Sequence, residues 1–132
     1  MPHPKYKLRK YETKLGERLQ VLELGKDSLA LHTDAKYICF GIPENIGIMG
    51  DHGNRGVEST WFHFVNSFLN LQSSDLCSGD EIILAGYFDF SPVMKIIESN
   101  STNSEERINA CRHAVANIID EEVEAFVKWV VL

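Results

Sequence analysis

Residues 36–64 read KYICFGIPENIGIMGDHGNRGVESTWFHF and contain three patterns in succession. The unbroken apolar run at 37–42 is typical of a strand that is buried on both faces. Four glycines follow with a spacing of three. The next segment predicts an amphipathic helix that begins near Ser59, because five apolar residues share one stripe. These are Trp61, Phe64, Val65, Phe68 and Leu69. A strand, a glycine-rich loop and a helix form the unit on which α/β proteins build ligand sites.

A second apolar run, Ile-Ile-Leu-Ala-Gly at 82–86, predicts another buried strand, parallel to the first across the helix. A short helix is expected after Pro92, with Val93, Ile96 and Ile97 on its apolar side. A capping signal then follows, in which Thr102 or Asn103 stands three residues before Glu105 or Glu106. It predicts the start of a long helix that continues to about residue 130.

These elements indicate an α/β protein, a partial three-layer α/β/α fold with a small, mainly parallel sheet. We expect one domain or fragment over residues 1–132. Residues 1–35 form a weakly patterned amino-terminal segment, and residues 36–132 form the strand–helix–strand unit and the long helix. Within the first segment, a short strand or a short helix fits Leu19, Val21, Leu22 and Leu24.

The composition excludes several classes of protein. A net charge of -6 argues against a nucleic-acid partner, which requires clustered Lys and Arg. No apolar run reaches the roughly 20 residues needed to cross a bilayer, and the first residues lack the apolar core of a signal peptide. The three cysteines, Cys39, Cys77 and Cys111, have no metal-binding or disulfide spacing. Free thiols in a cytoplasmic protein are therefore expected, with Cys39 and Cys111 buried.

The glycines at 47, 50, 53 and 56 allow two interpretations. Backbone N–H groups before a helix favour anions, so the loop is a candidate phosphate cradle. However, the loop contains acidic residues, no lysine and no GxxxxGK[ST] pattern. A folded surface loop with positive φ at several glycines is the favoured interpretation.

Few side chains in the chain suggest chemistry. Asp51 and His52 lie in the loop, and Asp89 follows the second strand, at the end where open α/β sheets bind ligands. His63 falls on the polar side of its helix. No Ser-centred GxSxG nucleophile motif occurs. We therefore assign no catalytic residue and no metal ligand. Asn45, Asp51, His52 and Asp89 are the candidates for the rim of an active site.

Three segments in this order resemble the amino-terminal part of arginase-like ureohydrolases, and most closely the formimidoylglutamase-like branch. They are the run at 36–61, the helix through SFLNLQ, and GDEIILAGYFDFS. The same branch carries TKLGE, here at 13–17, and Ile-Asp-Glu-Glu-Val, here at 119–123. The resemblance extends from about residue 13 to residue 131.

The resemblance implies a three-layer α/β/α enzyme that holds two Mn²⁺ ions and a bridging hydroxide. The hydroxide would attack the carbon of a guanidino or formimino group in a small amidine substrate. The family's metal ligands come from a glycine-rich motif ending in His, a DAHxD motif and a later DxD-type motif. None of the three occurs here, so no ligand is carried over to this chain. Asn45 also differs from the residue expected in that loop.

We therefore expect the amino-terminal portion of such a hydrolase, inactive alone and without a cofactor of its own. It would pack against the missing carboxy-terminal part or self-associate. The alternative is a self-contained α/β interaction or assembly module without catalysis, whose apolar last residues are covered by a partner. A nucleotide-binding strand–helix–strand module is a third hypothesis.

Overall fold

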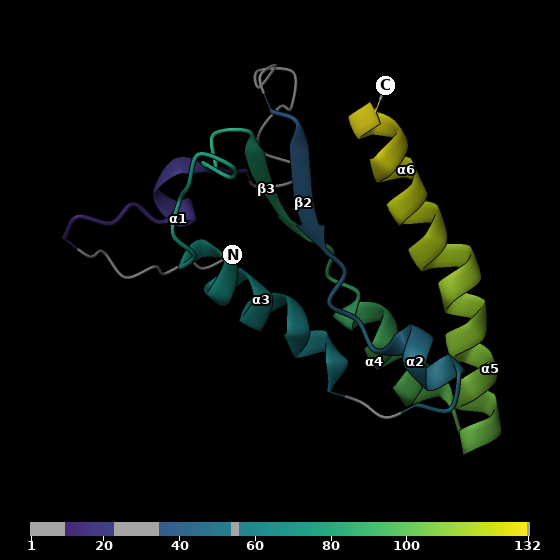
Figure 1. Ribbon diagram of the computed structural model, residues 1–132. Coiled ribbons are helices and arrows are strands. Elements are labelled where there is room, and N and C mark those ends of the chain that lie inside the picture. Colours follow the sequence, from purple (N-terminus) through teal and green to yellow (C-terminus); the bar gives the residue numbers. More distant parts are fainter. Residues whose placement is uncertain (1–9, 23–34, 54–55, 132) are drawn as a thin grey trace. The chain divides into compact units, whose positions relative to one another are not determined.

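The computed structural model describes residues 10–22, 35–53 and 56–131 (Figure 1). Leu24 of the amino-terminal prediction lies outside these residues. The chain divides into two compact units. Residues 1–42 and 59–88 form the first, called here the sheet unit, and residues 43–58 and 89–132 form the second, called here the helical unit.

The sheet unit is built on three parallel strands, β1 (Gln20–Val21), β2 (Tyr37–Gly41) and β3 (Ile82–Tyr87). Their order is β1-β3-β2, so β3 is central, and β2 lies beside it in Figure 1. Tyr37 is in register with Ile82 and Cys39 with Leu84. The α/β class and the two predicted strands are confirmed, and β3 is buried as predicted. The predicted burial of the run at 37–42 on both faces is wrong, because β2 is an edge strand in which only Gly41 is buried and Tyr37 is 63% exposed. The third strand resolves the choice that the sequence left open around Leu19, since Gln20 pairs with Ile83.

One apolar cluster holds the sheet unit together. Helix α3 (Thr60–Leu69), which follows the 3₁₀ turn η2 (Val57–Ser59), and helix α1 (Leu15–Arg18) pack on the strands. The cluster buries seven apolar residues. They are Leu15, Leu19, Trp61, Val65, Leu69, Ile82 and Leu84. Cys39 packs against this cluster but is only half-buried, so its predicted burial is partly correct.

The predicted apolar stripe of α3 is correct at Trp61, Val65 and Leu69 but wrong at Phe64. Phe64 is 42% exposed, and its ring stacks on Phe68 with centroids 5.2 Å apart. A helix of ten residues touches the sheet along one narrow line, so the ring at the margin of the stripe stays partly in water.

The end of β2 shows why a glycine is needed there. A Cβ atom added to Gly41 would lie 2.2 Å from Cδ2 and 2.6 Å from Cγ of Trp61. The indole therefore lies directly against the strand backbone, at a distance that no side chain allows. Its Nε1 atom is buried and has no hydrogen-bond partner among the described residues.

The helical unit contains α2 (Ile46–Gly50), α4 (Ser91–Asn100) and a long rod composed of α5 (Ser104–Ala114), η3 (Val115–Ile119) and α6 (Asp120–Val131). Figure 1 shows the rod as continuous, and the long helix is confirmed. The sequence did not predict that η3 is π-helical. The cap is formed by Asn103, whose Oδ1 accepts the Glu106 N–H at 2.9 Å, while Glu106 accepts from the Thr102 N–H at 2.8 Å. Cys111 is fully buried, as predicted.

The predicted glycine loop is partly wrong. Gly47 and Gly50 lie inside the short helix α2. Of the glycines at 47, 50, 53 and 56, only Gly56 has a positive φ, 118°. Close packing is the physical reason for glycine at position 50, because an added Cβ would lie 3.2 Å from Cγ of Arg112. The small residue lets α2 approach α5, and Nε of Arg112 donates to the Gly50 carbonyl at 2.7 Å.

Helix α4 is confirmed, but its buried face differs from the prediction. Met94 and Ile97 are buried, whereas Ile96 is 62% exposed. Met94 and Ile97 are three residues apart and share a face that Ile96 does not. Over the residues that the structure describes, no helix combines the length and the apolar character needed to cross a membrane.

Candidate functional site

A cavity of about 220 Å³ lies in the helical unit, where the two segments that leave β2 and β3 meet. The first segment, after β2, contributes Glu44 and Asn45, and the second, after β3, contributes Phe90, Ser91 and Lys95. These two segments are far apart in the chain, and the cavity brings their polar side chains together within one unit. It is therefore the candidate site.

Asn45 is the most buried polar residue in the wall of this cavity. It is 8% exposed and occupies the N-cap position of α2, where its carbonyl accepts the Met49 N–H at 3.0 Å. Its side-chain amide does not cap the helix and forms no hydrogen bond with the described residues. Among the described residues, only Nε1 of Trp61 is a fully buried side-chain polar atom without a partner, so the Asn45 amide keeps access to solvent. A polar ligand in the cavity would be able to hydrogen-bond to it.

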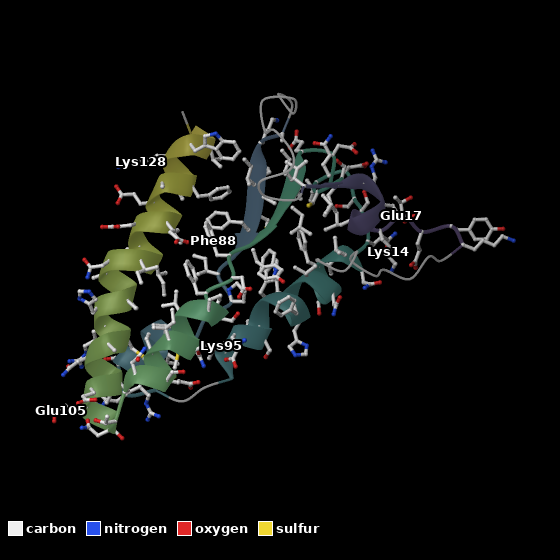
Figure 2. The ribbon with its side chains drawn as sticks, turned by 180° about the vertical axis from the view of Figure 1, so that it is seen from behind. Lys14, Glu17, Phe88, Lys95, Glu105 and Lys128 are labelled. Carbon is white, nitrogen blue, oxygen red and sulfur yellow. The ribbon has the colours of Figure 1, made fainter. Side chains whose placement is uncertain are left out.

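Two carboxylates and one ammonium group surround the same cavity. Oε2 of Glu44 accepts the Gly47 N–H at 2.8 Å, and Oε2 of Glu58 accepts the Gly56 N–H at 2.9 Å. Each carboxylate keeps a second oxygen. Lys95 projects from α4 (Figure 2), and its charge also acts on the carboxylate of Asp89, whose pKa it helps to lower. The site therefore offers both signs of charge over an apolar floor that includes Met94.

Asp89 is already used by the fold. Its Oδ1 accepts the Ser91 N–H at 3.0 Å. Hydrogen bonds from Ser91, first from the side chain and then from the backbone, lower the pKa of Asp89 below its ordinary value. Asp89 thus lies next to the cavity in sequence, and its carboxylate is held by the backbone N–H of Ser91, the first residue of α4.

Asp51 and His52 lie at the other end of α2 and do not line the cavity. Both are exposed. The backbone N–H of His52 donates to the Met49 carbonyl, and its φ is 62°, a conformation that ends the helix. The structure thus places one of the four rim candidates, Asn45, in the wall of the cavity, and a second, Asp89, two residues before Ser91 of that wall.

The arrangement can bind and orient a small polar molecule. Within the ranges that the structure describes, no group of three or more His, Cys, Asp and Glu side chains lies close enough to hold a metal ion. The sequence analysis missed Glu44, Glu58 and Lys95. A usable signal existed for Glu44, because it stands just beyond a predicted strand, like Asp89. Lys95 gave none, since a lysine on a helix is normally a solvated residue.

We compared the chain with protein-family models, curated proteins and solved structures, and none of the three comparisons returns a match.

Proposed function

We propose that this chain is the amino-terminal portion of a ureohydrolase-family hydrolase that acts on a guanidino or formimino C–N bond. The observation that carries the proposal is the order of the family-like segments, which fall on successive strands and helices of an α/β chain. The run at 36–61 covers β2, α2 and the start of α3, and GDEIILAGYFDFS covers β3 and the start of α4. The proposal is further supported by the parallel pairing of β2 with β3.

In this proposal the chain provides scaffold and rim, and the parent protein provides the metal. Segments that this chain does not contain would hold the two Mn²⁺ ions and the hydroxide. Asn45 and Lys95 would lie on the rim, where the Asn45 amide could hydrogen-bond to the substrate and the ammonium of Lys95 would face away from its cationic amidine group. The chain alone would be inactive, because it carries none of the family's ligand motifs.

The proposal also covers the compartment and the partner. Cys39, Cys77 and Cys111 are free thiols, which are typical of the reducing cytoplasm. The carboxy-terminal part of the parent, or a second copy, would cover apolar side chains of α6 that face water. Val127 is 41% exposed and Trp129 is 54% exposed.

The test begins with the gene beyond codon 132. We expect a strand followed by a glycine-rich motif ending in His, and then the two aspartate motifs. The longer product should release formamide or urea in a Mn²⁺-dependent reaction, assayed with formiminoglutamate, arginine and agmatine. The 132-residue chain should release neither. Turnover by the isolated chain, or a downstream sequence without these motifs, would refute the proposal.

The exposed apolar side chains of α6 also favour a second candidate, a self-contained interaction or assembly module. Sedimentation of the purified chain separates the two in part. A module that self-associates through α6 should give a concentration-dependent mass that the substitution Trp129→Ser abolishes. A stable monomer with a sharp unfolding transition would count against this candidate.

A further inference from the structure

A second cavity, of about 490 Å³, lies entirely within the sheet unit. It opens where β2 and β3 begin, since Tyr37 and Ile82 are the first residues of these strands and both line it. Its volume falls within the roughly 300–1,000 Å³ typical of small-molecule sites. No residue of the cavity in the helical unit takes part in it.

The wall of this cavity combines apolar and aromatic side chains with polar groups. Phe68 enters from α3, Ile38 and Ile82 enter from the sheet, and Leu76 comes from the segment that joins α3 to β3. Tyr37 is 63% exposed and supplies a second ring. Aromatic faces of this kind attract a cation that is placed over them.

The charges of the cavity are of one sign. Its described lining contains the carboxylates of Asp75 and Glu81 and no lysine or arginine. Glu81 is neutralised from outside, because Nζ of Lys36 lies 2.9 Å from its Oε1. Asp75 forms no hydrogen bond or ion pair with any described residue. Among the residues that the structure describes, one negative charge at the cavity therefore has no counter-charge.

We propose that this cavity binds a small organic cation, an ammonium group attached to an apolar body. The ammonium would pair with Asp75, and the body would lie against Phe68 and Ile82. This proposal does not rest on the hydrolase proposal, since it concerns different residues and needs no metal.

Two thiols make occupancy of the cavity measurable. Cys39 and Cys77 both line it, Cys39 half-buried and Cys77 exposed. Cys111 is fully buried on α5 in the helical unit and serves as an internal control. A bound molecule should slow alkylation of Cys39 by iodoacetamide, whereas Cys111 should stay unreactive with or without it.

The probes are three indoles that differ only in the polar end of a short side chain. Tryptamine carries an ammonium, tryptophol a hydroxyl and indole-3-acetate a carboxylate. We expect tryptamine to bind the 132-residue chain up to about five-fold more tightly than tryptophol, as one exposed ion pair allows. Indole-3-acetate should bind most weakly. Amide chemical shifts and Cys39 protection report the binding.

The substitution Asp75→Asn should weaken the binding of tryptamine up to about five-fold and leave the binding of tryptophol unchanged. Asp120→Asn removes an exposed carboxylate on α6 and should change neither. The amide spectrum of each variant establishes that it is folded. Equal affinity for tryptamine and tryptophol would overturn the proposal. An effect of Asp75→Asn no larger than that of Asp120→Asn, or the absence of saturable binding at millimolar concentrations, would do the same.

Discussion

The sheet unit and the helical unit join distant parts of the chain by different interactions. In the sheet unit, the backbone N–H of Leu22 donates to the Leu84 carbonyl at 2.8 Å, and Leu84 itself is buried in the apolar cluster. In the helical unit, the link from Arg112 to Gly50 uses one side chain and one carbonyl. Both units bury apolar side chains, Leu84 in the sheet unit and Ile46 and Cys111 in the helical unit. The helical unit adds the side-chain cap of α5 at Asn103 and the bond from Arg112 to the Gly50 carbonyl.

The two tryptophans allow the units to be monitored separately. Trp61 is buried in the sheet unit, and Trp129 is exposed in the helical unit. A Trp129→Phe background therefore leaves a fluorescence signal that reports the sheet unit alone. Far-ultraviolet circular dichroism reports mainly the helices.

The largest effect should come from removing volume from the cluster. Leu84 is fully buried, so Leu84→Ala should lower the free energy of unfolding of the sheet unit by about 2–5 kcal/mol. Leu76 is fully exposed, and Leu76→Ala should change it by less than about 0.5 kcal/mol. Urea denaturation followed at Trp61 measures both. A loss below about 1 kcal/mol for Leu84→Ala would mean that the cluster does not hold this unit.

A pair of glycines tests the comparison more finely. Gly41→Ala places a methyl group 2.2 Å from the Trp61 ring, and overpacking of this kind costs about 1–3 kcal/mol. Gly47→Ala in α2 meets Oε1 of Glu44 at 3.3 Å, a flexible side chain that can move. Because alanine also favours a helix, Gly47→Ala should be close to neutral. Equal losses in the two variants would contradict the different roles assigned to these glycines.

These differences also explain which features the sequence predicted. The strands, α3 and the long helix depend on local periodicity, and all were correctly placed. The capping signal allowed Thr102 or Asn103, and only the hydrogen bond from the Glu106 N–H to the Asn103 side chain distinguishes them. Burial of Met94 rather than Ile96 depends on what the helix packs against, which no local pattern contains. Likewise, the glycine ladder did not predict α2, because the reason for Gly50 is Arg112, 62 residues further along the chain.

The same limit applies to the candidate site. Asn45 was named as a rim candidate and does line the cavity, whereas Asp51 and His52 were named for their chemical type and lie outside its wall. The cavity in the sheet unit was not predicted at all. It brings together the start of β2, the end of α3 and residues 75–82, and no spacing in the sequence relates these segments.

A cap in the helical unit should have a moderate effect. Asn103→Ala removes the acceptor of the Glu106 N–H and should destabilise α5 by about 1 kcal/mol. Asn109 is exposed in the same helix and has no capping role, so Asn109→Ala should be neutral or slightly stabilising. Circular dichroism during urea denaturation measures the difference. If both variants behaved alike, the cap would contribute nothing to the rod.

The smallest effect concerns two aspartates whose pKa values are lowered for different reasons. In the sheet unit, a hydrogen bond from Arg18 and the charge of Arg18 lower the pKa of Asp80. Nη2 of Arg18 lies 2.5 Å from Oδ2 of Asp80. In the helical unit, hydrogen bonds from Ser91 are the main cause that lowers the pKa of Asp89. Because both folded pKa values lie below the unfolded ones, each stabilising effect is present above the ordinary aspartate pKa. Each is lost as the pH falls through the folded value.

Carboxyl carbon shifts measured by nuclear magnetic resonance during an acid titration separate the two causes. Arg18→Gln should return the pKa of Asp80 towards its ordinary value and leave Asp89 unchanged. Ser91→Ala should raise the pKa of Asp89 only in part, since the backbone N–H at position 91 still donates to it. High salt should raise the pKa of Asp80 more than that of Asp89, because salt screens an exposed ion pair more than it weakens a local hydrogen bond. Equal salt shifts at the two carboxyls would show that Arg18 does not hold Asp80 as an ion pair.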